Sequence, residues 1–268
     1  ESPFGTADDV ENGVAPAAKL IIQDAGFHGR DDCADLAALG CPVIDITPML
    51  EQAYFQGARL HNNSWGDREN FFPQNTYTAV CADMDEMTWR YPDFLFCIAA
   101  GNDGGRGEDT VGSPATAKNV LAVGATETGN FESITSFSSL GWTSDGRIKP
   151  DVCAPGRTVT SAFDPTAPGI HCSTGNVSGT SMASPITAGA AALVRQYYRE
   201  GWERLGAPTP DDARTTPTAA LVKATIVNGA DRLDTEPVPP SRAQGWGRVH
   251  LEEPLYFWSY LYDRTILG

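Results

Sequence analysis

The chain has 268 residues, of which 41% are hydrophobic and 20% are charged. These proportions are typical of a folded globular protein, and we expect one domain over residues 1–268. The formal net charge of −15 at pH 7 argues against nucleic-acid binding, which needs a basic surface. No apolar run reaches the length of a membrane-spanning helix, so a membrane is not an expected partner either.

Six cysteines, an even number, are spread along the chain without the close Cys-x-x-Cys pairs of a zinc site. Six cysteines allow fifteen connectivities, and pairing each cysteine with its nearest neighbour gives one of them. If these three disulfides form, they imply an oxidising compartment and a secreted protein. Buried free thiols are the alternative. The predicted pairs are Cys33 with Cys41, Cys81 with Cys97, and Cys153 with Cys172.

The first part of the chain contains segments of both helix and strand character. A turn at Gly13–Pro16 leads into a short apolar segment, Leu20–Gln23, which predicts a strand. Apolar residues at helical spacing predict a helix over Met49–Gln56, and Gly57 ends it. The segment Ala58–Gly66 then predicts a strand that ends in a glycine turn.

The same alternation continues further along the chain. Helical spacing over Tyr77–Arg90 stops at a proline, and the apolar run Phe94–Ala100 has the length of a buried parallel strand. Helix, buried strand and glycine-rich strand end form a repeating pattern. This pattern predicts an α/β fold with a doubly wound, mostly parallel sheet and helices on both faces, in which ligands bind at the carboxyl ends of the strands.

The run Gly179–Pro185 precedes helix formers whose side chains are apolar or small nearly all round as far as Arg195, which predicts a buried helix. Because proline is tolerated in the first turn, the helix should begin within a residue or two of Ser181. The Ser181 hydroxyl would then lie at the positive end of a helix dipole, where developing negative charge is favoured. An ordinary serine-capped helix is the alternative. A last helix is predicted over Pro217–Asn228.

The residues of this run, Gly-Thr-Ser-Met-Ala-Ser-Pro, resemble the nucleophile motif of the subtilisin-like serine peptidases, the subtilase family. The resemblance implies that Ser181 attacks the peptide carbonyl of a polypeptide substrate. The segment Ala99–Asn102 resembles the family's oxyanion motif, which implies that the side-chain amide of Asn102 donates to the tetrahedral intermediate. The resemblance is strongest to bacterial alkaline subtilases that carry an extra C-terminal β-domain, although Leu140 replaces an arginine often present there.

Other segments follow in the family's order and imply where a substrate binds. The strand that ends at Ser64–Gly66 resembles the one along which the substrate backbone runs as an added strand. Gly112 matches the glycine that floors the primary specificity pocket, where a missing side chain leaves room for a large apolar substrate group. The substrate-binding residues implied in this way are Ser64, Trp65, Gly66, Ala100, Gly101 and Gly112.

In the family, the catalytic aspartate and histidine come before the nucleophile. Both also come before a turn in the family that is similar to Gly13–Pro16. No histidine precedes Gly13, so we expect an N-terminally incomplete domain. The general base and the aspartate that orients it would come from a missing segment. We also expect residues 1–268 to be poorly stable alone. A catalytically inactive peptide-binding protein on the same scaffold is the alternative, because serine without a base is a weak nucleophile. The histidines predicted to be structural or solvated are His28, His61, His171 and His250.

The chemistry implied by the resemblance requires no cofactor. Structural calcium is common in the family, but the sequence contains no Asp-x-Asp-x-Asp loop. A calcium ion is therefore possible, and no ligand is assigned to it.

Overall fold

A four-stranded parallel sheet is the centre of the computed structural model, which describes residues 12–23, 45–67, 75–129, 133–163 and 173–256. Its strands lie side by side in the order β1-β2-β3-β4. All the carboxyl ends of these strands therefore lie along one edge. The strands are β1 (Leu60–Asn63), β2 (Leu95–Ala99), β3 (Leu121–Thr126) and β4 (Val152–Pro155).

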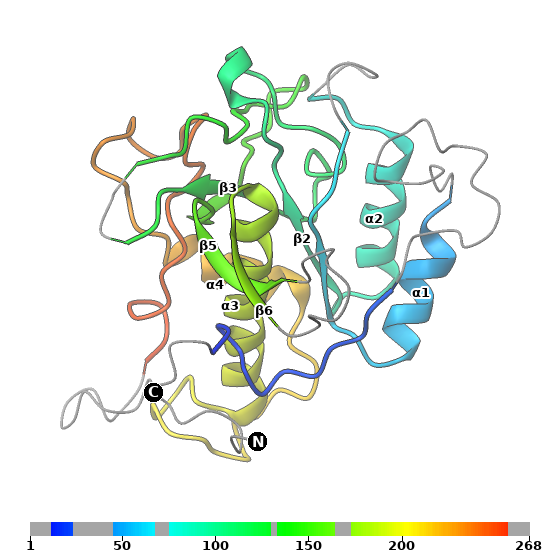
Figure 1. The fold of residues 1–268 in the computed structure, drawn as a ribbon. Helices are drawn as coiled ribbons and strands as arrows, with labels where there is room; N and C mark the ends of the chain where they lie inside the picture. The colour runs from blue at the N-terminus through cyan, green and yellow to red at the C-terminus, as the bar shows by residue number, and fades with distance from the viewer. Residues whose placement is uncertain (1–11, 24–44, 68–74, 130–132, 164–172, 257–268) are drawn as a thin grey trace.

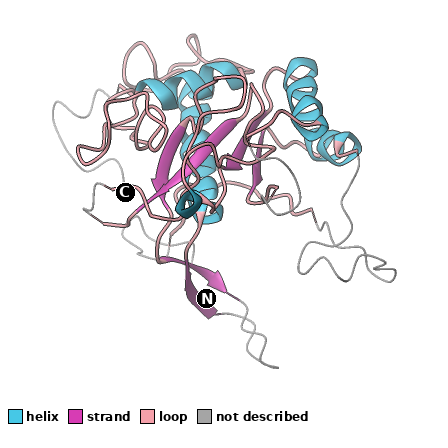
Figure 2. Cartoon of the chain, turned by 90° about the horizontal axis from the view of Figure 1, so that it is seen from above, coloured by secondary structure: helices cyan, strands magenta, loops and turns pink. Residues whose placement is uncertain are grey.

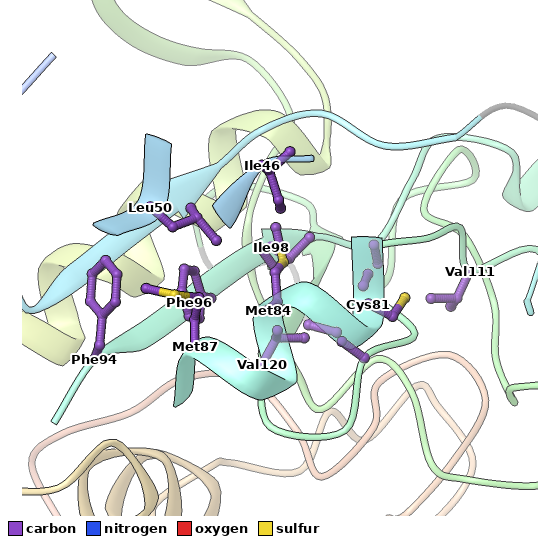
Figure 3. Close-up of a cluster of buried hydrophobic side chains, with 14 of the residues drawn as sticks. Ile46, Leu50, Cys81, Met84, Met87, Phe94, Phe96, Ile98, Val111 and Val120 are labelled. Atoms are coloured by element: carbon purple, nitrogen blue, oxygen red, sulfur yellow. The ribbon is translucent and has the colours of Figure 1, made fainter. Parts of the chain in front are cut away.

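Two helices, α1 (Thr47–Phe55) and α2 (Ala79–Arg90), cover one face of the sheet. Figure 3 shows the cluster beneath them, in which Leu50 and Met84 from the helices meet Phe96 from β2. All three side chains are fully buried. Every second side chain of β2 points to this face, because side chains alternate between the two faces along a strand.

The opposite face is covered by α3 (Thr180–Glu200) and α4 (Ala219–Asn228). Leu95 and Cys97 of β2 point into this second cluster, where they join residues of β3, β4 and both helices. Because helices lie on both sides, every residue of β2 is buried. The predicted α/β fold with a doubly wound, mostly parallel sheet is confirmed (Figure 1).

The remaining elements are a 3-10 turn, η1 (Gly104–Arg106), and a two-stranded antiparallel ribbon formed by β5 (Val159–Phe163) and β6 (Ser173–Val177). Figure 2 shows the ribbon extending away from the body of the protein. The chain leaves β6 and enters α3 within three residues. None of the described helices is long and apolar enough to cross a membrane.

The strand predicted over Leu20–Gln23 is absent, and this segment is an irregular stretch. Leu20 and Ile22 are each 81% exposed. Apolar residues adopt a strand only when a neighbouring strand accepts their backbone hydrogen bonds. In the described part of the chain no strand pairs with this segment, so its apolar pattern alone was a misleading signal.

The predicted disulfide between Cys81 and Cys97 is also wrong, because both residues are buried free thiols. Cys81 belongs to the cluster under α2, whereas Cys97 points into the cluster under α3 and α4, so the sheet separates them. Cys153 is a buried free thiol too, which contradicts its predicted disulfide. Burial raises the pKa of the Cys97 thiol to about 12 and makes it unreactive. The pair Cys33 with Cys41 lies outside the described residues.

Candidate active site

Three segments meet at the carboxyl edge of the sheet: the end of β1, the end of β2 and the beginning of α3. Gly179 precedes α3 with a φ of 157°, a conformation that favours glycine. Its N–H donates to the Gly156 carbonyl oxygen, 2.8 Å away, just beyond β4. The helix begins at Thr180, so Ser181 lies in its first turn as predicted from the position of Pro185. Ser181 does not act as the helix cap, which rules out the simple capping interpretation.

The hydroxyl of Ser181 is tied to the end of β1. It donates to the Ser64 carbonyl oxygen at 3.1 Å, while the Ser64 hydroxyl donates to the Ser181 carbonyl oxygen at 2.8 Å. Asn62 supports this pair, because its Nδ2 donates to the Ser64 hydroxyl at 3.1 Å. Its Oδ1 accepts at 2.7 Å from the fully buried Ser184 of α3. Together these contacts set the distance between the β1 end and the beginning of α3.

Asn102 follows β2 and is held by the residue before Ser181. Its Oδ1 accepts two hydrogen bonds from Thr180, one from the backbone N–H at 2.9 Å and one from the hydroxyl at 3.0 Å. The Thr180 hydroxyl in turn accepts from the Gly101 N–H at 3.2 Å. The whole amide lies beside Gly179, where an added Cβ would be 3.6 Å from Nδ2 and 3.7 Å from Oδ1. The neutral amide that the sequence predicts as oxyanion donor is thereby held beside Ser181, the predicted nucleophile.

The residues with predicted substrate-binding roles lie around the same point. β1 and β2 stay paired as far as Asn63 and Ile98, and the chain beyond them leads into Ser64–Gly66 and Ala100–Gly101. The Gly112 N–H donates to the Ala100 carbonyl oxygen at 3.1 Å, which places Gly112 beside the end of β2. We call these segments, with Gly112, the substrate-binding region.

Two glycines in this region cannot be replaced without movement of the backbone. A Cβ on Gly66 would lie 2.8 Å from the Ser113 carbonyl oxygen, and a Cβ on Gly112 would lie 2.8 Å from the Asp67 carbonyl oxygen. Both distances are far below an ordinary contact, and both involve backbone atoms. Close packing of the two chain segments therefore explains why glycine occupies both positions.

The histidines whose positions are described do not contact Ser181. His61 lies among aromatic rings near α1, with its ring nitrogens 3.1 Å from Gln23 Oε1 and 3.0 Å from Asn63 Nδ2. Burial lowers the pKa of His61 to about 4, so it is neutral at pH 7. His250 instead contacts Asp231. His28 and His171 lie outside the described residues.

Sequence reasoning missed three polar residues of this site, Thr180, Asn62 and Ser184. Two of them lie inside the Gly179–Pro185 motif, so the motif itself contained the signal. Asn62 lies on β1, two positions before Ser64, which directly follows the strand, and side chains two apart along extended chain point to the same face. The two-residue spacing from Ser64 could therefore have identified Asn62 as a residue of this site. In the part of the chain that is described, no group of three or more His, Cys, Asp or Glu side chains could hold a metal ion.

Similar proteins point to one family. A family model described as the subtilase family matches residues 4–247. Subtilisin NAT of Bacillus subtilis subsp. natto is 44% identical over 198 residues, which cover 67% of this chain and 48% of that protein. The serine protease/ABC transporter B family protein tagD of Dictyostelium discoideum is 28% identical over 316 residues, which cover 80% of this chain but 17% of its own length. The chain thus spans about a sixth of that relative.

Solved structures are similar as well. The prenylagaramide maturation protease PagA superposes with a TM-score of 0.59 at 25% identity, covering 80% of this chain and 66% of that one. The patellamide maturation protease PatA superposes with a TM-score of 0.57 at 26% identity, covering 81% of this chain and 67% of that one.

Proposed function

We propose, from the premise that this chain belongs to the subtilase family, that it carries the nucleophile and the oxyanion donor of a serine endopeptidase. Membership of the family supports peptide-bond hydrolysis by a serine protease. The observation that carries the finer proposal is the bridge through Thr180. One residue holds the amide of Asn102 and is followed directly by Ser181, so donor and nucleophile move as one unit.

In the proposed reaction the Ser181 oxygen attacks the carbonyl carbon of the scissile peptide bond. A histidine from a segment outside this sequence takes the hydroxyl proton, and an aspartate from the same segment orients that histidine. The carbonyl oxygen becomes an oxyanion, to which the Asn102 Nδ2 group donates a hydrogen bond. The intermediate then collapses, the leaving amine takes the proton from the histidine, and water releases the acyl group from Ser181.

The substrate is proposed to bind as an added strand along Ser64–Gly66 and Ala100–Gly101, with the residue before the scissile bond over Gly112. The Ser64 carbonyl oxygen, which accepts from the Ser181 hydroxyl, is one of the acceptors that an added strand would need. Substrate binding would therefore release the Ser181 hydroxyl from this contact. The hydroxyl could then donate to the general base.

A protein of this family that binds peptides without cutting them is the second candidate. One observation favours it: among the described residues, the Ser181 hydroxyl is bonded to a carbonyl oxygen and to no base. The retained geometry of Asn102 and Thr180 argues for the peptidase, because a binding site has no use for an oxyanion donor. Secretion is proposed only from the likeness to subtilisins, since the predicted disulfides involving Cys81, Cys97 and Cys153 are not formed. No calcium ligand is proposed.

A fluorophosphonate probe tests the proposed function directly, because it reacts only with an activated serine. The full-length protein is treated with the probe, and mass spectrometry locates the modified residue. Labelling at Ser181, absent after denaturation and absent in the Ser181→Ala variant, supports the peptidase. A matched control is Ser161→Ala, which removes an exposed hydroxyl from β5 and should leave labelling unchanged. Folded protein that is not labelled would support the peptide-binding candidate.

A further inference from the structure

Asp67 is the residue that follows Ser64–Gly66, at the point where this segment meets the floor of the substrate-binding region. Its backbone N–H donates to the Ser113 carbonyl oxygen at 2.7 Å. Its own carbonyl oxygen lies so close to Gly112 that a Cβ there would be only 2.8 Å away. Backbone contacts on both sides therefore fix Asp67 against the floor residue.

The carboxyl group of Asp67 is half-buried. Burial raises the pKa of this carboxyl above its usual value, and the Ser113 side chain only partly offsets that effect. Within the described ranges of the chain, no lysine or arginine forms an ion pair with it. A carboxylate that is partly shielded from water and has no cationic partner in the protein favours a ligand that carries a positive charge.

Other carboxylates near this region are already neutralised by the protein. Asp103, which follows the oxyanion residue, pairs with Arg106 at 3.7 Å. Asp109 pairs with Arg242, which also approaches Glu108 at 3.4 Å. Asp67 differs from them because its carboxylate has no such partner among the described residues, while its backbone lies against Gly112.

We propose that Asp67 selects peptides with lysine or arginine immediately before the scissile bond. The inference rests on the proposed function, because it assigns the substrate class of the same site. The aliphatic stem of the substrate side chain would run beside Gly112 and the Asp67 backbone that packs against it, and its charged group would reach the Asp67 carboxylate. Long basic side chains combine an apolar stem with a cationic end in this way. The large apolar group expected from Gly112 alone is thereby replaced by a basic one.

Two peptides that differ in one residue test the proposal on the full-length protein. The residue before the scissile bond is lysine in one peptide and norleucine in the other, which has the same unbranched stem without the ammonium group. We expect kcat/KM to be at least about tenfold higher for the lysine peptide, since an unpaired, partly buried charge discriminates strongly. Equal or faster cleavage of the norleucine peptide would overturn the proposal.

Variants assign the preference to one carboxylate. Asp67→Asn keeps the shape of the side chain and should abolish the preference for lysine, whereas Asp67→Glu should retain part of it. Asp234→Asn is the matched control, because it removes the same charge from a side chain that is 84% exposed, and it should leave the ratio unchanged. An Asp67→Asn protein that still prefers lysine would contradict the inference. A cooperative thermal melt of each variant shows that it is folded.

The same set of measurements separates the inference from the proposed function. Labelling at Ser181 together with a preference for norleucine would overturn only the inference. If Ser181 is not labelled, binding of the two peptides is measured by fluorescence anisotropy. Tighter binding of the lysine peptide that depends on Asp67 would then support the inference without the peptidase, and equal binding of the two peptides would overturn it.

Discussion

Ser64 and Ser181 exchange two hydrogen bonds although 117 positions separate them in the chain. Each residue donates from its hydroxyl to the backbone carbonyl of the other. Ser64 directly follows β1 and begins the segment along which a substrate is proposed to bind, and Ser181 is the proposed nucleophile. The pair therefore fixes the distance between the proposed substrate-binding segment and the proposed nucleophile.

Ser64→Ala is expected to lower kcat about fivefold to tenfold and to leave KM nearly unchanged. The substitution removes one hydrogen bond, worth about 1 kcal/mol, from the carbonyl of Ser181. It keeps the Ser64 backbone groups that a substrate strand would use. Steady-state kinetics with one peptide substrate measure both constants. A change in KM alone would mean that Ser64 only binds substrate and does not position Ser181.

Thr180→Val is expected to lower kcat about tenfold, because it removes the hydroxyl that holds the Asn102 amide. Asn102→Ala should lower kcat by about 10²–10³, which is the effect known for the corresponding oxyanion donor of a subtilisin. Because Thr180 acts through Asn102, the double variant should be no slower than Asn102→Ala alone. Steady-state kinetics of the two single variants and the double variant make the comparison.

The control for this pair is Thr187→Val, since the Thr187 hydroxyl donates within α3 to the Ala183 carbonyl oxygen and does not touch Asn102. Its kcat should match that of the unsubstituted protein. Additive losses in the Thr180 and Asn102 double variant would show that Thr180 acts on the reaction by another route.

Asp151→Asn is expected to lower the free energy of unfolding by about 3–5 kcal/mol, because it leaves a buried ammonium group without its counter-charge. Asp151 accepts from Lys149 at 2.7 Å and from Lys223 at 2.9 Å, and the side chain of Lys149 is 3% exposed. Burial lowers the pKa of Lys149 to about 8 even with this carboxylate present. Urea denaturation of the full-length protein measures the loss.

Asp145→Asn is the matched control for that measurement. Asp145 pairs with Arg147 at the surface, with half of its side chain exposed, and exposed pairs contribute less than about 1 kcal/mol. A similar loss in the two variants would mean that burial of the Asp151 charges has no special cost.

His250 is expected to stabilise the protein only at low pH. Burial acts to lower the pKa of His250, but Asp231 at 2.6 Å and Glu252 at 3.6 Å outweigh it and raise the pKa. A raised pKa in the folded state means that the stabilisation is complete below the unfolded value of about 6.5 and is lost as the pH rises through the folded value.

His250→Gln should therefore lower the unfolding midpoint at about pH 5.5 and have little effect at about pH 9. The difference in free energy should stay below about 1 kcal/mol, because both side chains of the contact are about one third exposed. Thermal melts across this pH range make the comparison. A difference that does not change with pH would show that packing, and not charge, explains the role of His250.

The sequence by itself determined the local features of this protein. The apolar run at Phe94–Ala100 predicted a strand buried on both faces, and β2 is such a strand. The position of Pro185 predicted where α3 begins, and the seven residues of Gly179–Pro185 were enough to indicate the family. These features depend on backbone preferences and burial within a short stretch of chain, which composition and spacing report directly.

Only the tertiary structure decided which distant residues meet. The contact of Thr180 with Asn102 and the separation of Cys81 from Cys97 by the sheet both depend on how strands pair and helices pack. The irregular Leu20–Gln23 segment depends on whether a neighbouring strand is there to accept its hydrogen bonds. Periodicity shows that a side chain is buried but not what it is buried against, because contacts across the fold are set by the packing of whole elements.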